Sequence, residues 1–98
     1  MAVKNITGIP EVDLSTELLI YPNPANKYLK LLLSGDHQTD EWSIIIFNLN
    51  GKPINQWDDI KLSTEAIQLD ISNLEPGFYI IWVSEGEFRF AEKFSVLR

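Results

Sequence analysis

Apolar and polar residues alternate in short runs from residue 17 onward, and turn-forming residues separate the runs at regular intervals. In residues 28–34, for example, Leu29, Leu31 and Leu33 share one face of an extended chain. Such alternation is typical of a strand with one buried face. No segment keeps a helical period over three turns. The pattern therefore predicts an all-β domain, an antiparallel β-sandwich of about seven strands.

The predicted strands differ in how many faces they bury. They cover residues 18–21, 28–34, 42–48, 53–57, 66–71, 78–84 and 88–97. Residues 42–48 are apolar on both faces, which predicts a central strand covered on both sides. Residues 58–65 are expected to form a loop rather than a helix. Residues 1–16 have no period and are expected to be a linker or a loose lead-in, which leaves 17–98 as one domain.

Two glycine-containing turns join predicted strands. Asn50 and Gly51 precede Lys52 and predict a tight hairpin, because both residues tolerate positive φ. Glu75-Pro76-Gly77 fits a type II turn with glycine in the third position. Tyr79 is expected to place its hydroxyl at the rim of a sheet. These residues are interpreted first as determinants of the fold.

Composition limits the range of functions. Ninety-eight residues with 45% apolar content can bury one modest core. The net charge of −6, without a basic cluster, argues against a nucleic-acid partner. No apolar run approaches the ~20 residues that span a bilayer, so no transmembrane segment is predicted. The chain has no cysteine, which excludes disulfides, thiolate nucleophiles and zinc–sulfur sites.

The sequence offers little catalytic chemistry. Its one histidine, His37, lies in a polar stretch without spaced partners and is interpreted as a loop residue. Asp36, Asp40 and Glu41 can supply carboxylate oxygens to calcium, but they lack the spacing and glycine of a known calcium loop. No catalytic residue, metal site or cofactor is predicted, and an enzyme is not expected.

Three tryptophans lie on predicted strands, and exposed tryptophan on a sandwich can stack on sugars. Trp42 and Trp82 are expected to fill the core, whereas Trp57 is the better candidate for an exposed ring. A carbohydrate-binding module and a structural spacer of immunoglobulin type therefore stay open as alternatives.

Four motifs together carry a resemblance that none carries alone. "YPNPANKYLKL", "FNLNGKPI", "LDISNLEPGFYIIWV" and "EKFSVLR" follow one another over residues 18–98. In this order they resemble the C-terminal sorting domain of proteins exported by the type IX secretion system of Bacteroidota (the Por secretion system). Two positions depart conservatively from the family: Asn48 stands where Asp is frequent, and Arg98 stands where Lys is common.

The resemblance implies a non-enzymatic, immunoglobulin-like sandwich at the C-terminus of a larger cargo domain. It further implies the translocon, shuttle and sortase components of this system as partners. The cargo would pass through the periplasm and reach the cell surface or the medium, where a sortase can remove the domain. The family motif residues on this chain are Asn50, Gly51, Lys52, Leu74, Gly77 and Tyr79.

Recognition candidates lie at both ends of the matched region. Pro22 and Pro24 fix φ and remove two N–H donors, which pushes Tyr21 and Asn23 toward an extended conformation. The Tyr21–Pro24 segment therefore suits a sheet edge or a stiff lead-in, and a structural and a recognition role are both open.

The second group of candidates comprises Lys93, Phe94, Val96 and Arg98. A last strand at a sheet edge has unpaired backbone groups, to which a partner can add a strand. Lys93 and Arg98 also stand out as cations on a domain of net charge −6. An uncapped edge can also support weak self-association into a homo-oligomer.

Overall fold

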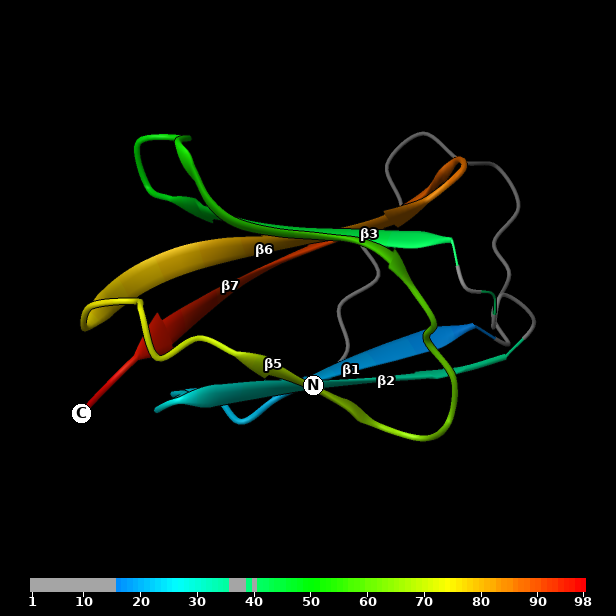
Figure 1. The fold of residues 1–98 in the computed structure, drawn as a ribbon, viewed down its shortest axis with the longest axis horizontal. Helices are drawn as coiled ribbons and strands as arrows, with labels where there is room; N and C mark the ends of the chain where they lie inside the picture. The colour runs from blue at the N-terminus through cyan, green and yellow to red at the C-terminus, as the bar shows by residue number, and fades with distance from the viewer. Residues whose placement is uncertain (1–15, 36–38, 40) are drawn as a thin grey trace.

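Two antiparallel β-sheets pack face to face in the computed structural model, which describes residues 16–35, 39 and 41–98 (Figure 1). The strands are β1 (Glu17–Tyr21), β2 (Tyr28–Ser34), β3 (Trp42–Asn48), β4 (Pro53–Ile60), β5 (Ile67–Asp70), β6 (Gly77–Glu85) and β7 (Phe88–Val96). Their orders are β1-β2-β5 and β4-β3-β6-β7. The described residues contain no helix, and hence none that could span a membrane. The predicted all-β sandwich is confirmed.

The core lies between the two sheets and follows the alternation of the sequence. Leu29, Leu31 and Leu33 of β2 face inward, as predicted, and are fully buried. Ile44 and Ile46 of β3 approach the core from the opposite sheet. Each such side chain contributes about 1.5–3 kcal/mol through burial of apolar surface. The two inward faces therefore hold the sandwich together.

The other face of β3 corrects an expectation. Its apolar residues on both sides predicted a strand that is covered on both faces, and β3 is indeed central in its sheet. However, Ile45 and Phe47 point away from the core and are only half-buried. A two-layer sandwich covers each sheet on one face. No described element covers the outer face of the four-stranded sheet.

Strand β4 is longer than predicted, because it continues through Asp58 and Asp59 to Ile60. The register between β3 and β4 shifts between Trp42 and Ile44, so β4 accommodates an extra residue there as a β-bulge. Asp59 has a φ of 56°, a conformation that aspartate tolerates better than most residues. The expected loop over residues 58–65 is therefore wrong at its start.

The β3–β4 hairpin differs in detail from the predicted Asn50-Gly51 turn. Asn48 N donates to Lys52 O (2.9 Å), which leaves the three residues Leu49–Gly51 as the loop. Asn48 Oδ1 accepts from the backbone N of Asn50 (2.9 Å) and of Lys52 (3.0 Å). Gly51 has a φ of 85°, whereas Asn50 does not have positive φ. The turn is thus a three-residue loop that ends in a left-handed glycine.

The β5–β6 connection also differs from the expected type II turn. Its hydrogen-bonded turn joins Leu74 N to Ile71 O (3.0 Å), before the predicted position. Gly77 begins β6 with a φ of 152°, far from the value near +80° that a type II turn requires. Positive φ at Gly77 is nevertheless confirmed. The Tyr79 hydroxyl donates to Glu75 O (2.6 Å), as in the tyrosine corner of immunoglobulin-like sandwiches.

Candidate recognition site at the end of the last strand

The segment after β1 crosses from one sheet to the edge of the other. Ala25 is buried and forms a parallel bridge with Val96 in β7. Its N donates to Ser95 O (2.8 Å), and its O accepts from Leu97 N (2.9 Å). Ala25 therefore pairs with the last residues of β7 on the side away from β6.

Asn23 extends this pairing through its side chain. Its Oδ1 accepts from Ser95 N (3.1 Å) and Ser95 Oγ (3.4 Å), and its Nδ2 donates to Lys93 O (3.5 Å). The flanking Pro22 and Pro24 follow cis peptide bonds and have no N–H to donate. The Asn23 side-chain amide thus forms the hydrogen bonds to the β7 backbone that a neighbouring strand would form with its own backbone. The predicted edge position of this segment agrees with the structure, because β1 is an edge strand and residues 23–25 contact the edge of β7.

The outer edge of β7 is consequently divided into two parts. In an antiparallel strand the backbone groups of alternate residues point to the same side. Those of Arg89, Ala91 and Lys93 therefore share the outer side with Ser95. Residues 23–25 pair with the end of this row, whereas no described strand pairs with it at Arg89 and Ala91. The prediction of an unpaired last strand is wrong for Ser95 and Leu97.

The four C-terminal recognition candidates lie in different environments. Phe94 and Val96 are fully buried, and the Phe94 ring lies 5.8 Å from that of Tyr79. A partner cannot touch these two side chains while the sandwich is intact. Lys93 is exposed, and its Nζ lies 4.8 Å above the centre of the Phe78 ring. The recognition role of this group stays a prediction.

Arg98 acts within the domain. Its guanidinium donates to the backbone carbonyl oxygens of Leu74, Asn26 (2.9 Å) and Ile71 (3.0 Å). The side chain thereby joins the β5–β6 connection, the β1–β2 connection and the end of the chain. Guanidinium has five donors and no acceptor, which suits a cluster of carbonyls. A lysine ammonium has three donors, so the residue common in the family can serve the same cluster.

Glu92 is a feature that the sequence reasoning missed. It lies on the inward-facing side of β7 between Phe90 and Phe94 and pairs in register with Ile81. Its Oε1 is buried and has no hydrogen-bond partner among the described residues. Burial raises the pKa of this carboxyl above its ordinary value of 4.5. The sequence does contain a signal for this feature, because the alternation of residues 88–96 places the charged Glu92 on the same face as the apolar Phe90 and Phe94.

The tryptophans correct a further expectation. Trp42 is fully buried, as predicted, and Trp57 is half-buried against the core. Trp82 was expected in the core, yet 37% of it is exposed. Trp82 is exposed because its side chain points away from the core, to the face of the four-stranded sheet that no described element covers.

The expected calcium and histidine candidates fall mostly outside the described residues. Asp36, His37 and Asp40 lie there, and Glu41 is exposed. The described residues contain no group of three or more side chains that could hold a metal ion.

The fold and the site define an immunoglobulin-like β-sandwich domain whose C-terminal residues are bound into the structure. Residues 19–97 match the family model of the secretion system C-terminal sorting domain. The chain belongs to this family, which marks a C-terminal signal for type IX secretion and implies export to the cell surface or the medium. No curated protein matches the chain. The resemblance drawn from the motifs is confirmed.

Proposed function

We propose that this domain directs a larger cargo, attached on its N-terminal side, across the outer membrane through the type IX translocon. Shuttle components recognise the domain in the periplasm, and a surface sortase can then remove it. The match of residues 19–97 to the sorting-domain family carries the proposal. The domain acts by being recognised and performs no catalysis.

The outer edge of β7 supports a specific mode of recognition. At Arg89 and Ala91, outward-pointing backbone groups can pair with an added strand of the export machinery. Residues 23–25 occupy the neighbouring positions at Ser95 and Leu97, so they limit how far such a strand can extend. Phe94 and Val96 contribute by holding β7 in the core, and Lys93 lies at the boundary between the two parts.

A reporter experiment tests export. Residues 1–98 are fused behind a signal peptide and a fluorescent protein, and a Bacteroidota host is used with and without a working translocon. Fluorescence outside the cell only with the translocon is expected. A folded reporter that stays in the periplasm of both strains would contradict the proposal.

Strand addition is tested by a point change, since a C-terminal deletion would remove Phe94 and Val96 from the core. Ala91→Pro deletes an N–H on the outer edge and leaves the bonds to β6 in place. We expect export to fall, while thermal unfolding shows that the purified variant is still folded. Normal export of a folded Ala91→Pro reporter would exclude this mode of recognition.

A further inference from the structure

One broad face of the domain is apolar and exposed, and its two cations lie on β7. This face is formed by the outward-pointing side chains of β3, β6 and β7, and we call it the outer face. It comprises Ser43, Ile45, Phe47, Phe78, Ile80, Trp82, Ser84, Arg89, Ala91, Lys93 and Ser95. The two charged members are both cations, although the whole chain has a net charge of −6. The carboxylate of Asp58 lies on the same side of the sheet but on β4, the edge strand farthest from β7.

The large rings of the outer face are well exposed to solvent. Phe78 is 55% exposed and Trp82 37%. Ile45, Phe47 and Ile80 lie half-buried between them, and no described strand covers the group. A contiguous exposed apolar patch on a small domain indicates an interaction surface.

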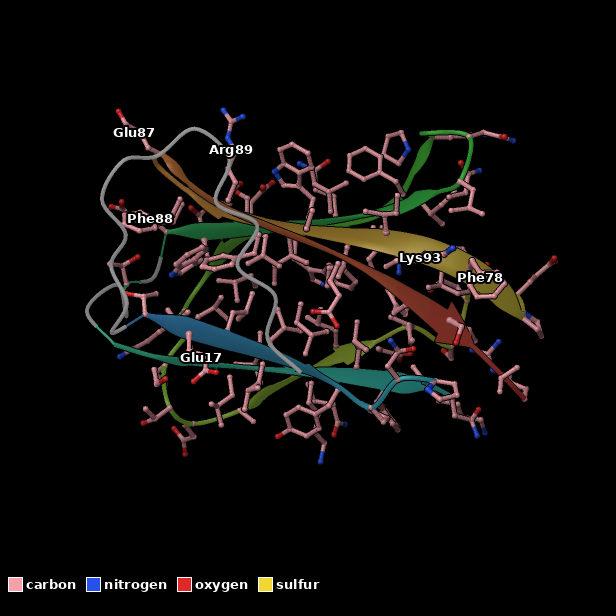
Figure 2. All side chains as sticks on the ribbon, turned by 180° about the vertical axis from the view of Figure 1, so that it is seen from behind. Glu17, Phe78, Glu87, Phe88, Arg89 and Lys93 are labelled. Atoms are coloured by element: carbon pink, nitrogen blue, oxygen red, sulfur yellow. The ribbon has the colours of Figure 1, made fainter. Side chains whose placement is uncertain are left out.

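Each cation of the outer face is held over an aromatic ring. Arg89 Cζ lies 5.8 Å from the centre of the Trp82 ring, and Lys93 Nζ lies 4.8 Å from that of Phe78. Figure 2 shows Lys93 beside Phe78, with Arg89 near the start of β7 and pointing away from the other sheet. Neither cation forms an ion pair with a described residue. The two positive groups are thus positioned and lack a carboxylate partner within the described chain.

We propose that the outer face docks a protein of the export machinery that presents carboxylates within an apolar surface; this rests on the proposed function. Carboxylates complement Arg89 and Lys93, while the apolar surround covers Phe78 and Trp82. A second copy of this chain fits less well, because it would bring the same two cations to the interface. A sugar ring also fits less well, because the two cations already lie over the aromatic rings that it would stack on.

Charge reversal tests the proposal in the export reporter. Arg89→Glu with Lys93→Glu should lower translocon-dependent export about tenfold or more, because like charges then meet across the interface. The matched control is Lys27→Glu with Lys30→Glu, which lowers the net charge equally and changes exposed lysines of the other sheet region. The control pair should export normally.

The outcomes distinguish a failure of the proposed export function from a failure of the proposed docking surface. If the unaltered reporter is not exported, the proposed function fails and this inference falls with it. If the unaltered reporter is exported and the Arg89/Lys93 reversal exports equally well, only the docking surface is overturned. Thermal unfolding of the purified variants shows whether a loss of export reflects a loss of fold.

Crosslinking identifies the occupant even if charge reversal perturbs the fold. A photoreactive phenylalanine replaces Phe78 in the exported reporter, and Tyr28, which is 48% exposed on the other sheet, serves as the control position. We expect Phe78-specific crosslinks to an acidic, apolar segment of an export component. Crosslinks to a second copy or to the cargo would overturn the proposal, as would polysaccharide binding that Trp82→Ala removes without any protein crosslink.

Discussion

The two halves of β7 have the same strand geometry and different surroundings. Each half buries one phenylalanine, Phe90 in the first and Phe94 in the second. On the outer edge, however, the second half is bound by Asn23 and Ala25, whereas no described strand pairs with the first. The residues that make this difference lie about 70 positions away in the sequence. Segments that are distant in the sequence therefore determine which backbone groups of β7 a partner can reach.

This division allows one strand to combine a structural role with the proposed recognition role. Its second half is fastened to the core and to the β1–β2 connection, which keeps the end of the chain folded. Its first half keeps backbone groups at an edge beside the outer face. We expect changes in the second half to act mainly on stability and changes in the first half to act mainly on recognition.

The largest effect on stability is expected for Phe94→Ala. Removing a fully buried aromatic ring should lower the free energy of unfolding by about 3–5 kcal/mol, because contacts are lost and a cavity remains. Denaturant unfolding measures the change, and the exposed neighbour change Lys93→Ala should cost under about 1 kcal/mol. Equal losses for the two variants would contradict the assignment of Phe94 to the core.

A smaller effect is expected for Arg98→Ala. The change removes three charged hydrogen bonds to backbone carbonyls, and partial exposure to water limits the loss to about 1–2 kcal/mol. Arg98→Lys should keep most of the stability, because ammonium can donate to the same carbonyls. Thermal unfolding compares the two variants. If lysine proves as destabilising as alanine, the bonds depend on guanidinium geometry.

Asn23→Ala should affect the second half of β7 and leave the first half unchanged. It removes the side-chain bonds to Ser95 and Lys93 and should cost about 1 kcal/mol. In hydrogen exchange the Ser95 amide should exchange faster than before, while the outward Ala91 amide should not change. Asn26→Ala is the control, since Asn26 contributes only its backbone carbonyl. Faster exchange at Ala91 as well would mean that the two halves open together.

The smallest effect is expected for Glu92→Gln, and it depends on pH. The raised pKa means that the folded protein binds this proton more tightly than the unfolded chain. Stability is therefore highest below the unfolded value of 4.5 and falls as the pH rises from there through the folded pKa. Glutamine removes this fall, so the variant should gain stability relative to the unaltered protein at pH 7 and lose that gain near pH 3. Denaturant unfolding at both pH values measures this gain. A stability difference between the two proteins that does not vary with pH would contradict the prediction.

The strands could be predicted from sequence because their signal is local. β2 and β3 begin and end where the alternation and apolar runs predict, and Tyr79 donates its hydroxyl at a sheet rim. The turns were predicted less well. The β3–β4 loop has three residues that end in Gly51, and Gly77 begins β6 with a φ of 152° in place of the type II value.

The surroundings of the candidate recognition residues could be predicted only in part. The motifs indicated the candidates, but their contacts depend on segments that are distant in the sequence. Phe94 is buried by the opposite sheet, and Arg98 bonds to two separate connections. Trp82 was misplaced, because a period of two shows that a strand has two faces and does not show which face is covered.

The sequence by itself therefore determined the all-β class, the approximate strands, the sorting-domain family and the absence of cysteine chemistry. Each depends on residue type, period or order along the chain. Tertiary structure alone decided that Asn23 and Ala25 cover the end of β7, that Glu92 is partly enclosed and that the outer face stays exposed. These features arise where segments far apart in sequence meet, because packing between the sheets determines which backbone and side-chain groups water can still reach.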